Sequence, residues 1–298
     1  MHLETLKTFC DLVETGSLSK AAKQNRVTQS AVSQQLRALE ARYGKRLVDR
    51  APRLGARPTE VGLAFYRELK PLLGALALLE ERVRERPDVV SGHVRVATVY
   101  SVGLHTLPPV MKKSLSAYPA LELRLEYRRT DQVYDACLRG EADLGIVALP
   151  MKRPQLEVVS LGADELVLAV APEHPFARKK SVSLSDLAGE PFIAFERDIP
   201  TRKLVDRLLR RAGVRARPVM ELDNIETIKR TVEAGIGISL LPAPALVSEV
   251  RAESIVARKL RESPIERPIG LIYRKSRALS RGARAFVDLL TGELAFAR

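Results

Sequence analysis

Apolar residues recur at helical spacing in three short segments at the start of the chain. The first covers residues 3–13 and stops at Gly16, a residue type that commonly ends helices. The second can begin at Ser17 or Ser19, because a serine hydroxyl can cap the first turn of a helix. The third lies within residues 28–43. The pattern therefore predicts three helices that pack around a common core.

The outer face of the third predicted helix carries side chains that can contact DNA bases. These polar positions are Gln29, Ser30, Ser33, Gln34 and Arg37. Gln and Arg can each bind a base edge through two hydrogen bonds, and a recognition helix meets base edges near its N-terminal end. We therefore predict a helix-turn-helix that binds double-stranded DNA. A solvated polar face on an ordinary three-helix bundle is the alternative that the spacing leaves open.

The segment after the third helix is basic and rich in turn residues. It holds Arg46, Arg50, Arg53 and Arg57 together with a glycine and two prolines, which is typical of a hairpin. Ten basic and two acidic side chains lie within residues 16–57. Such an excess attracts phosphates, so we expect a wing that contacts the DNA backbone or the minor groove.

Residues 60–86 alternate apolar and charged positions, as in one helix of about 25 residues. Antiparallel pairing of two copies would bury its apolar side and hold two recognition helices at a fixed distance. Packing on its own chain alone is the alternative. We expect a linker and dimerisation segment over residues 60–91. Its apolar positions are Val61, Phe65, Leu69, Leu72, Leu73, Leu76, Leu79 and Val83.

The C-terminal two hundred residues alternate strand-like and helical stretches. This order predicts an α/β domain of two lobes, with parallel sheets covered by helices on both faces. The chain would cross to the second lobe near residues 162–165 and return near residues 267–270. The predicted strands lie within residues 94–99, 121–127, 144–148, 166–171, 192–195, 219–222 and 236–241.

Ligands of open α/β sheets bind beyond the carboxyl ends of strands, where helix N-termini offer N–H groups. We therefore expect a small anionic effector in a cleft between the lobes. The candidates stand at predicted strand-to-helix turns, although each could be only a helix cap. They are Tyr100, Ser101, Thr130, Phe195, Thr201, Arg202 and Asn224.

Composition narrows the class of protein further. The formal net charge of +13 favours polyanionic partners, and no apolar run reaches the length of about 18 residues that a membrane span needs. Cys10 and Cys137 lie in apolar segments of different predicted domains, so we interpret both as buried thiols. We expect a globular protein of the cytoplasm that has no membrane partner.

The sequence gives little support for a catalytic site or a metal site. Ser101 and His105 stand four residues apart, yet no acidic residue near them in the sequence is placed to orient the imidazole. The histidines show no metal-ligand spacing with one another or with cysteine. We therefore expect no enzyme, no catalytic residue, no metal, and no cofactor apart from the effector. A two-lobed small-molecule-binding protein or enzyme with an N-terminal nucleic-acid anchor is the alternative.

The chain resembles the LysR-type transcriptional regulators through four motifs: LKTF at residues 6–9, GSLSKAA at 16–22, TQSAVSQQLRALE at 28–40 and PTEVG at 58–62. Two places depart from the family pattern. Leu47-Val48 stands where the family usually has Leu-Phe, and the residues that follow Arg53 replace its commoner wing sequence. Both departures fall outside the predicted recognition helix, which they leave unaffected.

The resemblance implies a winged helix-turn-helix over residues 1–59 and a periplasmic-binding-protein-like effector domain over residues 92–298. Lobe I would hold residues 92–162 and 268–298, and lobe II residues 163–267. The family likeness points to Ser101, Thr130 and Thr201 as effector contacts, whereas Arg202 and Asn224 rest on local chemistry alone. It further implies a homodimer or homotetramer that binds DNA and contacts RNA polymerase.

Overall fold

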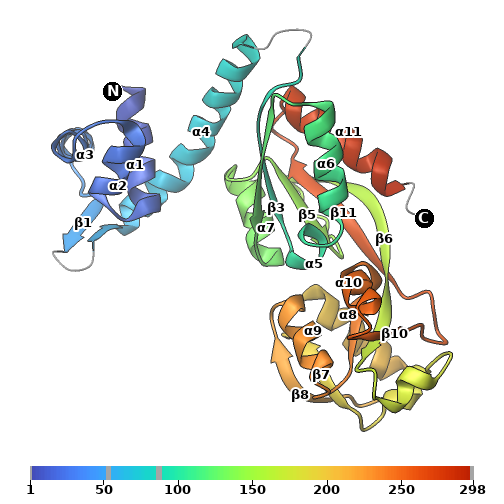
Figure 1. Ribbon diagram of the computed structural model, residues 1–298. Helices are drawn as coiled ribbons and strands as arrows, with labels where there is room; N and C mark the ends of the chain where they lie inside the picture. Colours follow the sequence, from blue (N-terminus) through green and yellow to red (C-terminus); the bar gives the residue numbers. More distant parts are fainter. Residues whose placement is uncertain (1, 52–54, 85–88, 296–298) are drawn as a thin grey trace. The chain divides into compact units, whose positions relative to one another are not determined.

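The computed structural model describes residues 2–51, 55–84 and 89–295 (Figure 1). The chain divides into an N-terminal compact unit, Met1–Arg84, and a larger unit that holds almost all of the remainder. Each unit is described by itself. No helix in the described ranges combines the length and the apolarity that crossing a membrane requires.

Three helices build the N-terminal core, and local caps set their ends. Gly16 ends the first helix with a φ of 61°, a left-handed conformation that glycine adopts without strain. The Ser17 hydroxyl accepts a hydrogen bond from the Lys20 amide, and the Thr28 hydroxyl accepts one from the Ala31 amide. The predicted three-helix domain is confirmed. Its helices are α1 (Leu3–Thr15), α2 (Leu18–Asn25) and α3 (Gln29–Tyr43).

The predicted basic hairpin is confirmed as an antiparallel pair of strands, β1 (Val48–Ala51) and β2 (Gly55–Pro58). The Glu40 carboxylate of α3 accepts hydrogen bonds from the Leu47 and Val48 amides, at 2.8 and 3.2 Å. This carboxylate ties the wing to the third helix. The Leu47 and Val48 side chains, which depart from the family pattern, are buried in the same core.

The long helix α4 (Glu60–Arg84) begins against the N-terminal core and then leaves it. The aromatic rings of Phe65 and Phe9 lie 5.4 Å apart in an edge-to-face contact, and Leu69 is buried. Further along, Leu72, Leu79 and Val83 are 66, 57 and 80% exposed. The apolar stripe is thus divided: Phe65, Leu69 and Leu73 pack on the N-terminal core, whereas Leu72, Leu79 and Val83 lie exposed.

Gly62 shows why this helix starts so close to the wing. A Cβ atom at this position would lie 1.9 Å from the Leu47 carbonyl oxygen. Only glycine fits this approach, which explains the glycine of the PTEVG motif in physical terms.

A mixed sheet forms the first lobe of the larger unit. The strand order in this lobe is β6-β11-β5-β3-β4, in which β3, β4 and β5 are parallel. Helices α6 and α11 contribute to the apolar cluster on one face of this lobe, and α7 contributes to another (Figure 1). The elements are β3 (Gly92–Thr98), α5 (Tyr100–Gly103), α6 (Leu107–Ala117), β4 (Leu121–Tyr127), α7 (Thr130–Arg139), β5 (Leu144–Ala148), β6 (Leu156–Val170), β11 (Glu266–Arg274) and α11 (Arg281–Ala295).

The second lobe continues from the same long strand. The end of β6 pairs with β9 and β10, and β7 pairs with β8 in parallel. Helices α8 and α9 pack on separate apolar clusters. The elements are η1 (Pro175–Arg178), η2 (Leu184–Leu187), β7 (Pro191–Phe195), α8 (Pro200–Arg211), β8 (Arg217–Leu222), α9 (Ile225–Glu233), β9 (Ser239–Pro242), η3 (Ala243–Leu246), α10 (Val247–Arg251) and β10 (Val256–Arg258).

The expectation of parallel sheets was therefore wrong for four of the nine described strands of this unit, namely β6, β9, β10 and β11, whose strand pairings are all antiparallel. Strands β6 and β11 run antiparallel to each other and pass from one lobe to the other side by side, with Glu266 opposite Glu165. The sequence analysis missed β10, β11 and the first half of β6. The return of the chain that was expected near residues 267–270 lies within β11. The two strands instead form the double connection between the lobes (Figure 1).

Candidate functional site

The predicted DNA-reading face lies on the exposed side of α3. Val32, Leu36 and Leu39 point into the core and are at most 3% exposed. The opposite face holds Gln29, Ser30, Gln34 and Arg37, all exposed, and Ser33, which is half-buried. The structure thus brings the five predicted base contacts together on one side of one helix.

Two of the wing arginines that were expected to contact phosphates lie in its described strands. Arg57 is an exposed residue of β2 and stands opposite Asp49 in the strand pairing. Arg50 belongs to β1. Arg53 lies outside the described residues.

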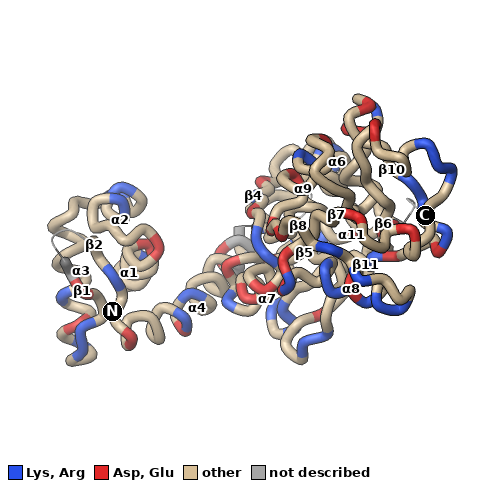
Figure 2. Tube along the Cα trace, turned by 90° about the horizontal axis from the view of Figure 1, so that it is seen from below, with Lys and Arg blue, Asp and Glu red and all other residues tan. Residues whose placement is uncertain are grey.

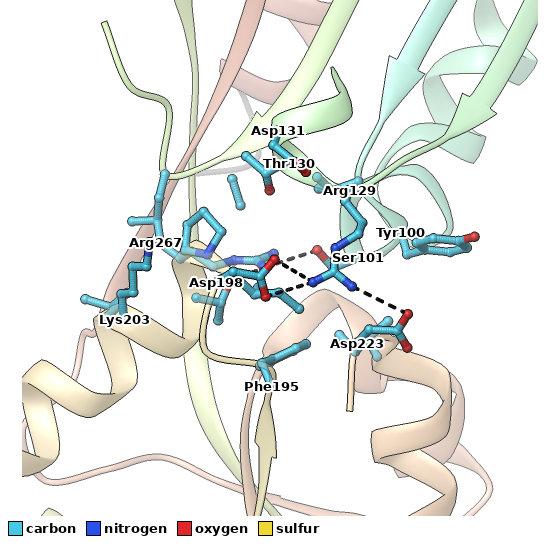
Figure 3. A pocket seen from close by; sticks show the side chains of 18 of the residues that line it. Tyr100, Ser101, Arg129, Thr130, Asp131, Phe195, Asp198, Lys203, Asp223 and Arg267 are labelled. Atoms are coloured by element: carbon cyan, nitrogen blue, oxygen red, sulfur yellow. Dashed lines mark hydrogen bonds and ion pairs between the residues drawn. The ribbon is translucent and has the colours of Figure 1, made fainter. Parts of the chain in front are cut away.

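A pocket of about 460 Å³ opens between the two lobes (Figure 3). Its wall comes from the residues that follow β3, β4, β5 and β7, which is the strand edge that the sequence analysis named. Five of the seven predicted effector contacts line it: Tyr100, Ser101, Thr130, Phe195 and Thr201.

Arg267 of β11 joins the two lobes at this pocket. It is 1% exposed, and its Nε atom donates to the Asp164 carboxylate at 2.8 Å. Its Nη1 atom donates to the Ser101 hydroxyl oxygen at 3.1 Å and to the Thr201 hydroxyl oxygen at 3.4 Å. Since both hydroxyl oxygens accept from Arg267, their own hydrogens can be donated to a bound anion. No sequence motif marked Arg267, because its partners lie far away in the chain.

Arg202 and Asn224 do not line this pocket. The Arg202 guanidinium donates to the Phe195 carbonyl oxygen at 2.7 Å and to Asp206 at 2.8 Å. The Asn224 side chain accepts from the Glu226 amide at 2.8 Å and so caps α9. The prediction that these two residues contact the effector therefore finds no support in their positions.

Arg129 reaches from the start of α7 to acidic residues of the other lobe (Figure 3). Its Nη2 atom donates to Glu196 at 2.8 Å and to Asp198 at 2.6 Å, and its Nη1 atom lies 3.8 Å from Asp223. Hydrogen bonds from Arg129 hold the pKa of the Asp198 carboxyl below its usual value. Arg129 also lines the pocket, and the sequence analysis did not single it out.

His105 forms a second polar contact between the lobes. Its Nε2 atom lies 2.8 Å from the Glu226 carboxylate of α9. No acidic residue near His105 in the sequence was expected to orient this imidazole, and the carboxylate that contacts it belongs to Glu226, 121 positions later in the chain. The Ser101 hydroxyl bonds Arg267 instead.

The two cysteines are free and buried, as predicted. Burial raises the pKa of the Cys10 and Cys137 thiols to about 12. Within the described ranges, no three side chains of His, Cys, Asp or Glu are grouped so that they could hold a metal ion.

Two family models together cover almost the whole chain. Residues 3–63 match the model described as a bacterial regulatory helix-turn-helix protein of the lysR family, and residues 87–295 match the LysR substrate binding domain. The second match alone covers more than half of the chain.

Individual relatives agree with these models. The chain is 31% identical to the uncharacterized HTH-type transcriptional regulator YeiE of Escherichia coli K12, over 97% of each chain. It is 24% identical to the HTH-type transcriptional regulator CysL of Bacillus subtilis strain 168, again over 97% of each. The structure of full-length CbnR complexed with its target DNA has a TM-score of 0.74 and 25% identity, over 97% of this chain and 99% of that one.

Proposed function

Because the chain belongs to the LysR family of DNA-binding transcriptional regulators, we propose that it controls transcription in response to a small anion bound between its two lobes. The observation that carries the effector part is the meeting of the Ser101 and Thr201 hydroxyls on one buried arginine, Arg267. Its relatives are regulators and not enzymes, so the alternative of an enzyme with a nucleic-acid anchor is not favoured.

The helix-turn-helix binds double-stranded DNA, as in the family. We propose that the exposed face of α3 reads bases through Gln29, Ser30, Ser33, Gln34 and Arg37. We further propose that Arg50, Arg53 and Arg57 bind phosphates, so that their loss weakens binding to all sequences.

Regulators of this family form oligomers, and we propose that α4 supplies the first interface. Leu72, Leu79 and Val83 would be covered by the same residues of a second chain, which places two copies of α3 at two half-sites. We propose a homotetramer made of two such dimers, acting in the cytoplasm, and a contact with RNA polymerase that the effector alters.

The effector is bound, in this proposal, by Tyr100, Ser101, Thr130, Phe195 and Thr201. The two hydroxyls donate to an anionic group, while the start of α8 adds the partial positive charge of a helix N-terminus. No cofactor is proposed beyond this ligand.

Closure of the lobes would convey the signal. Only β6 and β11 need to bend, because they run together between the lobes. A ligand that contacts Ser101 in one lobe and Thr201 in the other binds the closed arrangement better, and this difference in affinity shifts the population of closed molecules.

The proposed reading of DNA is tested by binding to the DNA upstream of the protein's own coding sequence and to a scrambled fragment, over a series of salt concentrations. The wild-type protein should prefer the native fragment, and Gln34→Ala should lose most of that preference. Gln155→Ala, which removes an exposed glutamine of the larger unit, is the matched control and should bind like wild type. Equal, weak and salt-sensitive binding to both fragments by every variant would contradict the proposal.

A further inference from the structure

Six cationic side chains line the pocket, but their charges are not equally compensated. They are Arg128, Arg129, Arg153, Lys203, Arg207 and Arg267. Asp164 binds Arg267, and Glu126 binds Arg128 at 2.7 Å. Arg129 is held by carboxylates of the other lobe. These three guanidinium groups therefore add little net charge to the site, because each is paired with a carboxylate.

The other three cations have no such partners. Among the described residues, no carboxylate forms an ion pair with Arg153, Lys203 or Arg207. The Asp206 carboxylate, which lies on the same helix, binds Arg202 instead. We call these three cations the α8 subsite, since two of them lie on that helix.

The α8 subsite faces a defined part of the pocket. Lys203 and Arg207 are one helical turn apart on α8, so both reach the same wall. The Arg153 guanidinium lies 4.5 Å from the centre of the Tyr134 ring, which restricts where it can point. Figure 2 shows the basic positions of α8, and in Figure 3 Lys203 lies across the pocket from Tyr100 and Ser101.

The carboxylates in the described lining are Asp131, Asp198 and Asp223. Asp198 and Asp223 form their ion pairs with Arg129, although the charge of Lys203 also helps to lower the pKa of Asp198. Within this described lining, no ion pair joins a carboxylate to the α8 subsite, so its three cations remain the ones that can pair with a bound anion.

We propose that the effector is an organic dianion, a deeper assignment that rests on the proposed function. One anionic group accepts from the Ser101 and Thr201 hydroxyls, and the second binds the α8 subsite. Leu149, Ile199 and Leu204 also line the pocket and give it apolar surface, which suits a carbon skeleton that joins the two groups. A dicarboxylate or a phosphorylated carboxylic acid has this chemistry.

Isothermal titration of the full-length protein tests the proposal. The probes are succinate, glutarate and adipate, their monomethyl esters, and inorganic phosphate. At least one diacid should bind about tenfold more tightly than its monoester, because the ester removes the charge that the α8 subsite compensates. The double substitution Lys203→Gln and Arg207→Gln should reduce that ratio to about threefold or less, with the monoester affinity unchanged.

Arg210→Gln is the matched control. Arg210 is exposed on the same helix but does not line the pocket, so this variant should keep the wild-type ratio. Arg153→Gln should also lower the diacid affinity, because it removes the third cation of the α8 subsite. Thermal melting checks that each variant is folded.

Two results would overturn the inference, and they differ in whether the proposed anion site at Ser101 stands. If a diacid and its monoester bind alike, or if the double variant keeps the wild-type ratio, the α8 subsite is refuted and the anion site at Ser101 stands. If no probe binds while sequence-specific DNA binding persists, both the dianion and the anionic effector are refuted, and the DNA-binding function stands.

Discussion

Replacement of Arg267 by methionine should destabilise the larger unit and leave the N-terminal unit intact. The methionine keeps much of the volume of the arginine stem but removes the guanidinium that binds Asp164. The Asp164 carboxylate, whose side chain is 8% exposed, would then be a buried charge without its partner. Removal of one member of a buried ion pair costs about 3–5 kcal/mol.

Hydrogen exchange followed by mass spectrometry measures this loss of stability separately for each segment of the chain. A cost of about 3 kcal/mol corresponds to exchange that is more than a hundredfold faster. Peptides from β6 and β11 should show this acceleration in Arg267→Met, whereas peptides from α1 to α3 serve as an internal control and should not change. The variant should also bind effector poorly, because the Ser101 and Thr201 hydroxyls lose their common donor.

The double variant Arg267→Met with Asp164→Asn separates charge from packing. Once the carboxylate is gone, the remaining cost should fall to about 1–2 kcal/mol, which is the penalty for an imperfectly bonded polar group. Exchange in β11 that is less than about fivefold faster in the single variant would refute the reasoning, since it would mean that Asp164 is not buried as a charge.

Three further predictions concern the other parts of the chain. Glu40→Ala should lower the thermal stability of the N-terminal unit by about 2 kcal/mol, since two wing amides lose a charged acceptor, whereas Glu40→Gln should lose less in the same melt. Cys10 and Cys137 should resist a thiol reagent at pH 8, because burial raises both pKa values to about 12, and both should react in urea; fast labelling of the native protein would contradict this. Arg57→Gln should weaken DNA binding by a similar factor for all sequences and reduce the slope of log K against log salt by about 1, and a change of sequence preference would count against a phosphate contact.

The N-terminal unit could be predicted from the sequence because its signals are local. Gly16, Ser17 and Thr28 act within one helical turn of their own positions, and the apolar spacing of α3 fixes which side faces the core. The base-reading candidates follow directly, since they occupy the other side of the same helix.

The pocket was predicted in outline for a similar reason. Ser101 and Thr201 stand just after strands, and the carboxyl ends of strands meet at one sheet edge. The orientation of side chains on α8 could not be deduced in this way. Adjacent residues of a helix point about 100° apart, so Arg202 faces inward to Phe195 while Lys203 faces the pocket.

The remaining features that the sequence did not predict include two contacts between residues far apart in the chain. Arg267 meets Ser101 across 166 positions, and His105 meets Glu226 across 121. No periodicity of the chain encodes either contact, because both depend on how the lobes pack. Strand β11 was missed for a different reason, since Pro268 and Gly270 are turn residues by type but occupy a bulge in a buried strand.

Footprinting of the target DNA shows whether a small anion in the pocket changes how this regulator binds DNA. The measurement compares wild type with Thr201→Val, with and without the anionic small-molecule fraction of the host cells, separated by ion exchange. The anionic fraction should alter the wild-type footprint, and Thr201→Val should keep the basal footprint and lose the response. An unchanged response in Thr201→Val, or a response to the neutral and cationic fraction only, would contradict this expectation.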